Sequence, residues 1–158
     1  SGSDFGSITT MANAFAISPN LTSVTFPSNC DFSALTTFHR GFYNCSNMAT
    51  IDLGTIQDFG NIGDVGTVWQ TFRGLGTCSI NFLTTTNIQS TTSLSNFMIG
   101  TTIQTSQYDN LLQALDTAGN SNGTLTGGSS TYTTAGAGGT ARAALVTDGW
   151  TITDGGGI

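Results

Sequence analysis

The chain has 158 residues and a formal net charge of −6, with 8% charged residues, no lysine and no glutamate. The negative charge argues against a nucleic-acid partner, because phosphate neutralisation needs clustered lysine and arginine, and it disfavours an anionic membrane surface. The absence of lysine excludes a P-loop and Schiff-base chemistry. No apolar run reaches membrane-spanning length, so we expect no membrane insertion.

The N-terminal half carries a repeat with a period of 27 residues, marked by Asp-Phe pairs that begin at Asp4, Asp31 and Asp58. Apolar residues recur at the same step. A fixed period of this length predicts a solenoid, in which each coil buries its apolar face only against its neighbours. The matched positions are Ile8, Leu35 and Ile62; Met11, Phe38 and Val65; Phe15, Phe42 and Trp69; and Leu21, Met48 and Leu75.

Each predicted coil has three parts: a loop that opens with Asp-Phe, a short helical segment and a short strand. The helical segment is predicted from the spacing of Leu35, Phe38 and Phe42. The strand carries the L-x-x-L-x-L signature of leucine-rich repeats, in which alternate residues face the core. The expected inward residues are Leu21, Val24 and Phe26 in the first coil and Met48, Ile51 and Leu53 in the second.

The third strand has two possible registers, with either Cys78 and Ile80 or, slipped by two residues, Ile80 and Phe82 facing inward. The slipped register leaves Asn87-Ile88 in the place of Asp-Phe, at the start of a fourth, degenerate coil. We therefore expect an α/β repeat solenoid of about three to four leucine-rich-repeat-like coils over residues 4–105.

Residues 106–158 depart from the repeat and predict an α/β cap that closes the downstream end within the same continuous domain. A helix is predicted from one apolar face, with Gly119 as its stop signal. The glycine-rich residues 120–139 follow, as either a disordered linker or an ordered loop. A second short helix over about Thr140–Thr147 and a strand over Trp150–Ile152 complete the cap. The apolar face of the first helix comprises Tyr108, Leu111, Leu112 and Leu115.

Two parts of the chain carry a resemblance to a known family. Residues 42–53, FYNCSNMATIDL, resemble the repeat of BspA-type leucine-rich-repeat surface proteins. The stretches TSQYDNLL (105–112), GGSSTY (127–132), ARAAL (141–145) and GWTITDGG (149–156) resemble the terminal module found in bacterial surface proteins and phage tail-fibre-like proteins. The resemblance implies adhesion or receptor recognition at an extracellular cell or virion surface. It carries over no catalytic residues.

The Asp4, Asp31 and Asp58 column permits two interpretations. Stacked carboxylates about 4.8 Å apart could form a Ca²⁺ ladder. Alternatively, each Asp accepts backbone N–H groups at the start of its coil. We favour capping, because the sequence supplies one obvious carboxylate per coil, and we expect no metal and no cofactor.

Aromatic residues at repeat positions are expected to be structural, because a stacked aromatic row inside a solenoid belongs to its core. This set comprises Phe5, Phe32, Phe59, Phe15, Phe42, Trp69 and Trp150.

The solvent-facing strand positions are the predicted binding surface, since short polar side chains suit hydrogen bonding to a glycan or a flat protein surface. A merely solvated sheet face is the alternative. The row, in the slipped register, comprises Ser23, Thr25, Thr50, Asp52, Ser79 and Asn81.

The three cysteines form no zinc pattern, because the chain has no C-x-x-C and His39 lacks a companion at ligand spacing. We expect mostly buried thiols, with a Cys30–Cys45 bridge left open. A hydrolase is disfavoured, since it needs paired carboxylates or a Ser/His/Asp set.

The sequence thus favours a non-enzymatic adhesion or receptor-recognition module that binds a cell-surface glycan or protein. The alternative is a purely structural component of a virion, fibre or surface layer. In both cases we expect further chain or an assembly partner to stack on the N-terminal coil, and a homo-oligomer is possible.

Overall fold

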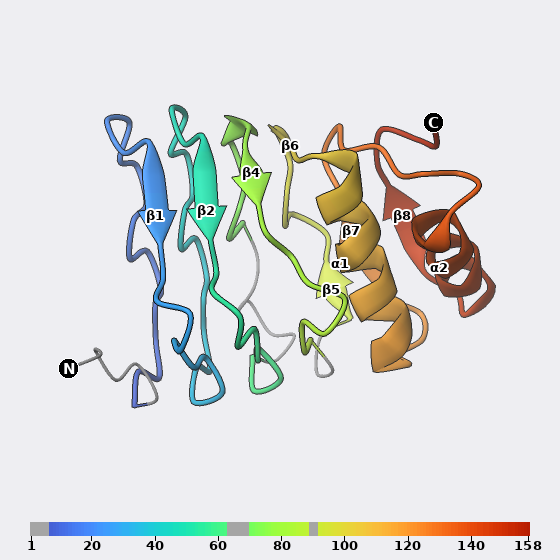
Figure 1. Ribbon diagram of the computed structural model, residues 1–158, viewed down its shortest axis with the longest axis horizontal. Helices are drawn as coiled ribbons and strands as arrows, with labels where there is room; N and C mark the ends of the chain where they lie inside the picture. Colours follow the sequence, from blue (N-terminus) through green and yellow to red (C-terminus); the bar gives the residue numbers. More distant parts are fainter. Residues whose placement is uncertain (1–6, 63–69, 89–91) are drawn as a thin grey trace.

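The computed structural model describes residues 7–62, 70–88 and 92–158, which form a row of short parallel strands and turns with two helices in the C-terminal part (Figure 1). The predicted positions Asp4, Phe5, Val65 and Trp69 lie outside these residues. The elements in chain order are β1 (Ser23–Thr25), β2 (Thr50–Asp52), β3 (Gly76–Thr77), β4 (Ser79–Ile80), β5 (Ser93–Leu94), β6 (Thr101–Thr102), α1 (Thr105–Ala118), β7 (Thr124–Thr126), α2 (Ala137–Thr147) and β8 (Thr151–Thr153).

The first sheet has the order β1-β2-β4, and all its strands are parallel (Figure 1). Val24 lies opposite Ile51, and Ile51 lies opposite Ile80. The third strand therefore has the slipped register, with Ile80 in the place of Ile51. Ile51 and Ile80 are fully buried, whereas Val24 on the edge strand is half-buried. β-branched residues at these positions suit a pleated surface with one face in the core.

The short helix predicted from Leu35, Phe38 and Phe42 is wrong: this segment consists of successive turns. Arg40 and Asn44 adopt positive φ values of 54° and 56°, which helical residues do not have. The backbone N–H of Phe42 donates to Thr71 O of the next coil (2.9 Å). Turns of about the same length as a helical turn place the same residues inward, so the spacing alone did not distinguish the two.

Aromatic rings stack from coil to coil through the core. Phe15 and Phe42 lie with centroids 5.0 Å apart and planes at 8°, and Phe42 and Phe72 follow at 5.7 Å and 11°. The column predicted to run from Phe42 to Trp69 thus continues through Phe72, three residues later in the longer third coil. Phe32 and Phe59 form a second stacked pair at 5.0 Å.

Helix α1 borders β4 in the place where another strand would pair. The Gln107 side chain accepts a hydrogen bond from Ile80 N (3.0 Å) and donates one to Ser79 Oγ (2.9 Å). Asn110 Nδ2 donates to Phe82 O (2.8 Å). Two side-chain amides thereby satisfy backbone groups that a strand ladder would otherwise pair.

Two further parallel sheets have the orders β3-β6 and β5-β7-β8, and α2 packs on α1. The first predicted helix is observed as α1, which ends at Gly119 in the left-handed conformation (φ 70°). α2 begins three residues before the predicted Thr140. The glycine-rich connection is ordered, since it holds β7, with Leu125 buried at its centre.

Within residues 7–62, 70–88 and 92–158, no helix is long and apolar enough to cross a bilayer.

Gly128 has φ 65°, and a Cβ at this position would clash with the Thr101 and Met98 carbonyl oxygens. Only glycine fits this turn without strain.

Candidate functional site

The predicted polar row lies on the first sheet, at the side-chain positions that alternate with its buried residues. Ser23, Thr50 and Ser79 lie opposite one another on adjacent strands, and Thr25 lies opposite Asp52. The parallel register therefore brings residues from three coils onto one surface.

Two members of the row are engaged with each other and are not free to bind a partner. Asn81 Nδ2 donates to Asp52 Oδ1 (2.6 Å), and the same oxygen accepts the Gly54 N–H (2.9 Å). Asn81 Oδ1 accepts the Leu53 N–H (2.7 Å). Asp52 and Asn81 thus hold the ends of β2 and β4 in place, and both are only half-exposed.

A third member, Ser79, accepts the hydrogen bond from Gln107 and lies at the border with α1. Ser23, Thr25 and Thr50 remain. All three are exposed, and their hydroxyl groups have no hydrogen-bond partner among the described residues. The surface available for recognition is therefore this hydroxyl triplet, Ser23, Thr25 and Thr50, rather than the whole row.

The triplet is chemically neutral and flat. Each hydroxyl group can donate one hydrogen bond and accept two, so the surface complements hydroxyl or amide groups without demanding charge. Such contacts resemble the polar part of a protein or glycan interface.

The Asp column accepts backbone hydrogen bonds. Asp31 Oδ1 accepts the Ser33 N–H (2.8 Å), and Asp58 Oδ1 accepts the Gly60 N–H (3.0 Å) and Asn87 Nδ2 (2.8 Å). The hydrogen bonds from Ser33 lower the pKa of Asp31 below its ordinary value. Among the described residues, no group of three or more His, Cys, Asp or Glu side chains lies close enough to hold a metal ion.

All three cysteines are buried and free, so no Cys30–Cys45 bridge is present. Burial, with a smaller effect from Asp31, raises the pKa of the Cys30 thiol to about 11. Burial and the neighbouring Cys45 raise the pKa of Cys78 to about 12. These thiols are protonated at neutral pH and therefore poor nucleophiles. His39 Nδ1 is buried and has no hydrogen-bond partner within the described residues, so no described acid orients this imidazole as a catalytic base would require.

A buried charge cluster in the C-terminal part was not predicted. Asp154, whose side chain is 2% exposed, accepts hydrogen bonds from Arg142 Nε (2.9 Å), Tyr108 Oη (3.0 Å) and the Gly156 N–H (3.1 Å). Arg142 also lies over the ring of Tyr132, with its Cζ 4.9 Å from the centroid. Burial, the Asp154 charge and the hydrogen bond to Asp154 raise the pKa of Tyr108. The cluster joins α1, α2 and the turn after β8.

One signal in the sequence could have found this cluster: Arg142 is the only cation after residue 73, and Asp154 follows it at the end of a strand. Asp154 also begins an Asp-Gly-Gly sequence that is typical of a turn. Its Oδ1 does accept the Gly156 N–H, as a turn former does, while Oδ2 pairs with Arg142.

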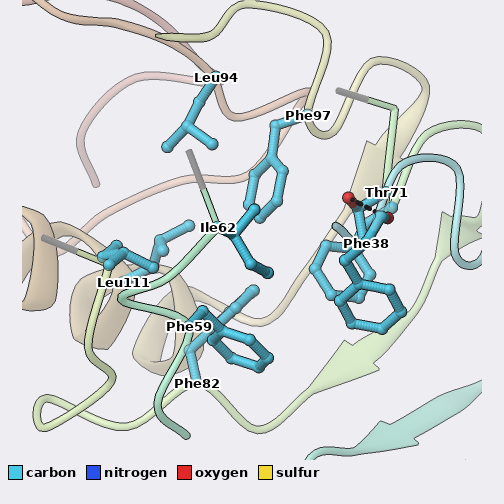
Figure 2. A pocket seen from close by; sticks show the side chains of 10 residues that line it. Phe38, Phe59, Ile62, Thr71, Phe82, Leu94, Phe97 and Leu111 are labelled. Atoms are coloured by element: carbon cyan, nitrogen blue, oxygen red, sulfur yellow. Dashed lines mark hydrogen bonds between the residues drawn. The ribbon is translucent and has the colours of Figure 1, made fainter. Parts of the chain in front are cut away.

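A cavity of about 30 Å³ lies in the core between the coils and α1 (Figure 2). Its volume is that of roughly one water molecule, and an apolar cavity of this kind stays dry. The one polar lining residue, Thr71, donates its hydroxyl hydrogen to Phe38 O. The lining residues are Phe38, Phe59, Ile62, Thr71, Phe72, Phe82, Ile88, Leu94, Phe97 and Leu111. The cavity is apolar and offers no polar group to orient a ligand.

Comparison of the chain with protein-family models, with curated proteins and with solved structures finds no match.

Proposed function

We propose that this chain is a leucine-rich-repeat-like solenoid that acts as a non-enzymatic recognition module at an extracellular surface. The cell surface or virion setting comes from the resemblance to BspA-type repeats and their terminal module. The partner is a cell-surface glycan or a protein, bound without metal or cofactor.

The observation that carries the proposal is the hydroxyl triplet on a rigid sheet. β1 and β2 hold Ser23, Thr25 and Thr50 in a fixed register, and the hydroxyl groups make no hydrogen bond with the described residues. Fixed, neutral and unsatisfied polar groups lose little conformational entropy when they bind. The low net contribution of each neutral hydrogen bond predicts weak binding by one module and stronger binding by multivalent display.

The test is binding of the chain, displayed on beads at high density, to intact cells and to a glycan array. Thr50→Arg places a long charged side chain opposite Ser23 within the triplet and is expected to abolish binding. Thr147→Arg on α2 is the matched control, because Thr147 is also exposed and its hydroxyl bonds only to Ala143 O in its own helix. Equal binding by both variants would move the site away from the triplet.

The alternative is a purely structural component of a virion, fibre or surface layer. It is supported by a different observation, the absence of any charged residue between positions 5 and 30, which suits a surface buried in an assembly. Self-assembly without any cell or glycan binding would favour this alternative.

A further inference from the structure

The two ends of the row of coils leave core positions half-buried. Six hydrophobic residues pack against the core yet remain partly exposed, and all lie towards one end or the other: Ile8, Phe15, Leu21 and Val24 in the first coil (residues 7–30), and Tyr132 and Ile152 near the C-terminus. The matching residues of the second coil, Phe42, Met48 and Ile51, are at most 1% exposed. A neighbouring coil covers those positions inside the chain, so each end presents the surface on which a coil stacks.

Backbone hydrogen bonds join each coil to its neighbours in both directions, as in a parallel ladder. A backbone N–H of each coil donates to a carbonyl of the coil that follows, in the series Phe15 to Gly41, Phe42 to Thr71, Phe72 to Phe97, Met98 to Thr126 and Gly127 to Thr153. The last partner in this series lies in β8, which pairs only with β7 among the described residues. β8 therefore has an outer edge that continues the same parallel ladder.

Side chains of the second coil also donate hydrogen bonds to carbonyl groups of the first coil. Thr36 Oγ1 donates to Thr9 O (2.9 Å), and Asn47 Nδ2 donates to Pro19 O (2.7 Å) of the preceding coil. Thr9 and Asn20 stand 27 residues before Thr36 and Asn47 and are both exposed. The first coil thus carries, at its upstream side, the same donors that elsewhere bond to a preceding coil.

Electrostatic repulsion does not oppose contact with a second copy at the first coil. Residues 7–30 contain no charged side chain in a chain of net charge −6. Proteins usually protect an open strand edge from pairing with charged side chains, lysine above all. The first coil has an edge strand, β1, without this protection, and the N-terminal and C-terminal coils lie at opposite ends of the molecule (Figure 1).

We propose that the first coil of one copy stacks head to tail on the C-terminal coil of a second copy, so that the segment around Thr10 extends the ladder from the outer edge of β8. The half-buried Ile8 and Phe15 of one copy then cover Ile152 and Tyr132 of the other, together with Ile158, which is 72% exposed. A heterologous contact of this kind repeats without closing and builds a filament. Thr50 of the hydroxyl triplet lies in β2, outside the first coil, so the Thr50→Arg variant tests recognition separately from assembly.

The test uses variants that block one end each, studied by analytical ultracentrifugation over a concentration series. Val24→Lys blocks the upstream end and Ile152→Lys the downstream end; Asn20→Lys and Ile158→Lys, at exposed positions, replace them if either fails to fold by circular dichroism. Ile56→Lys is the matched control, because Ile56 is an exposed isoleucine (42%) in the second coil.

The unchanged chain and Ile56→Lys are expected to grow beyond dimers with concentration. Each end-blocked variant alone should remain monomeric, with association weakened at least tenfold. An equimolar mixture of upstream-blocked and downstream-blocked chains should give dimers and nothing larger, since one competent end of each remains. Dimers of the downstream-blocked variant alone would show that upstream ends meet each other instead. Monomers of the unchanged chain at millimolar concentration would show that no second copy occupies the first coil. Either result would overturn the proposal.

Discussion

Phe42 lies at the centre of the aromatic column, and its replacement by alanine is the most direct test of how the coils hold together. The side chain is 0% exposed and stacks on Phe15 and Phe72, with Phe38 packed edge-on at 5.7 Å. A buried Phe→Ala change costs about 3–5 kcal/mol through lost burial and the cavity left behind. Two coils meet at this ring, so the site collapses poorly, and we expect a loss of about 4–5 kcal/mol in the free energy of unfolding.

Two further variants separate the contributions. Phe42→Leu keeps most of the volume and removes the ring contacts, so we expect a loss of about 1–2 kcal/mol. Phe15→Ala removes a ring from the half-buried end of the same column, and its expected cost is about half that of Phe42→Ala, because less area leaves water on folding. Urea unfolding followed by far-ultraviolet circular dichroism gives each value by linear extrapolation. A cost below about 1.5 kcal/mol for Phe42→Ala, or equal costs at Phe42 and Phe15, would refute the role assigned to the column.

Three other predictions concern single groups. Asp154→Ala leaves Arg142 and Tyr108 without their buried partner and should destabilise the fold by about 3–5 kcal/mol in the same urea assay, with Asp148→Ala, at an exposed position, as the near-neutral control. Ser33→Ala removes one of the hydrogen bonds that lower the pKa of Asp31, so an NMR titration should show this pKa rise towards its ordinary value. Because the pKa of Asp31 is lower in the folded state than in the unfolded state, its charged carboxylate stabilises the fold at pH values above the unfolded-state pKa. This stabilisation of the fold is lost as the pH falls through the folded-state pKa. The Cys30 and Cys78 thiols, with pKa values raised to about 11 and about 12, should resist a thiol reagent at pH 8 in the folded protein and react once urea unfolds it; rapid reaction without denaturant would contradict their burial.

The spacing of apolar residues predicted much of the core, because burial depends on which side chains face inward and not on how the backbone brings them there. Leu35, Phe38 and Phe42 are all buried at the predicted positions, although turns replace the predicted helix. The distinction between helix and turns depends on where the backbone hydrogen bonds go. Here they go to the next coil, which a local pattern of three residues does not reveal.

The sequence predicted where the polar side chains of the candidate site lie, but not which of them are free to bind a partner. Alternation of buried and exposed residues placed Ser23, Thr25, Thr50 and Asp52 on one face. It left two registers open for the third strand, since a slip of two residues keeps the same face outward, and the structure has the slipped register. Whether a polar side chain is already satisfied depends on residues far away in sequence, such as Gln107 for Ser79. The Asp154 cluster was missed for the same reason, since Tyr108 stands 46 residues away from its partner.

The amide side chains that α1 presents to β4 have a consequence for aggregation. An open strand edge is a template on which unfolded chains add as cross-β structure. Gln107 and Asn110 occupy the backbone groups of Ile80 and Phe82 with side chains that cannot propagate a ladder, so templated aggregation cannot begin there. A chain in which α1 is not docked lacks this protection at β4.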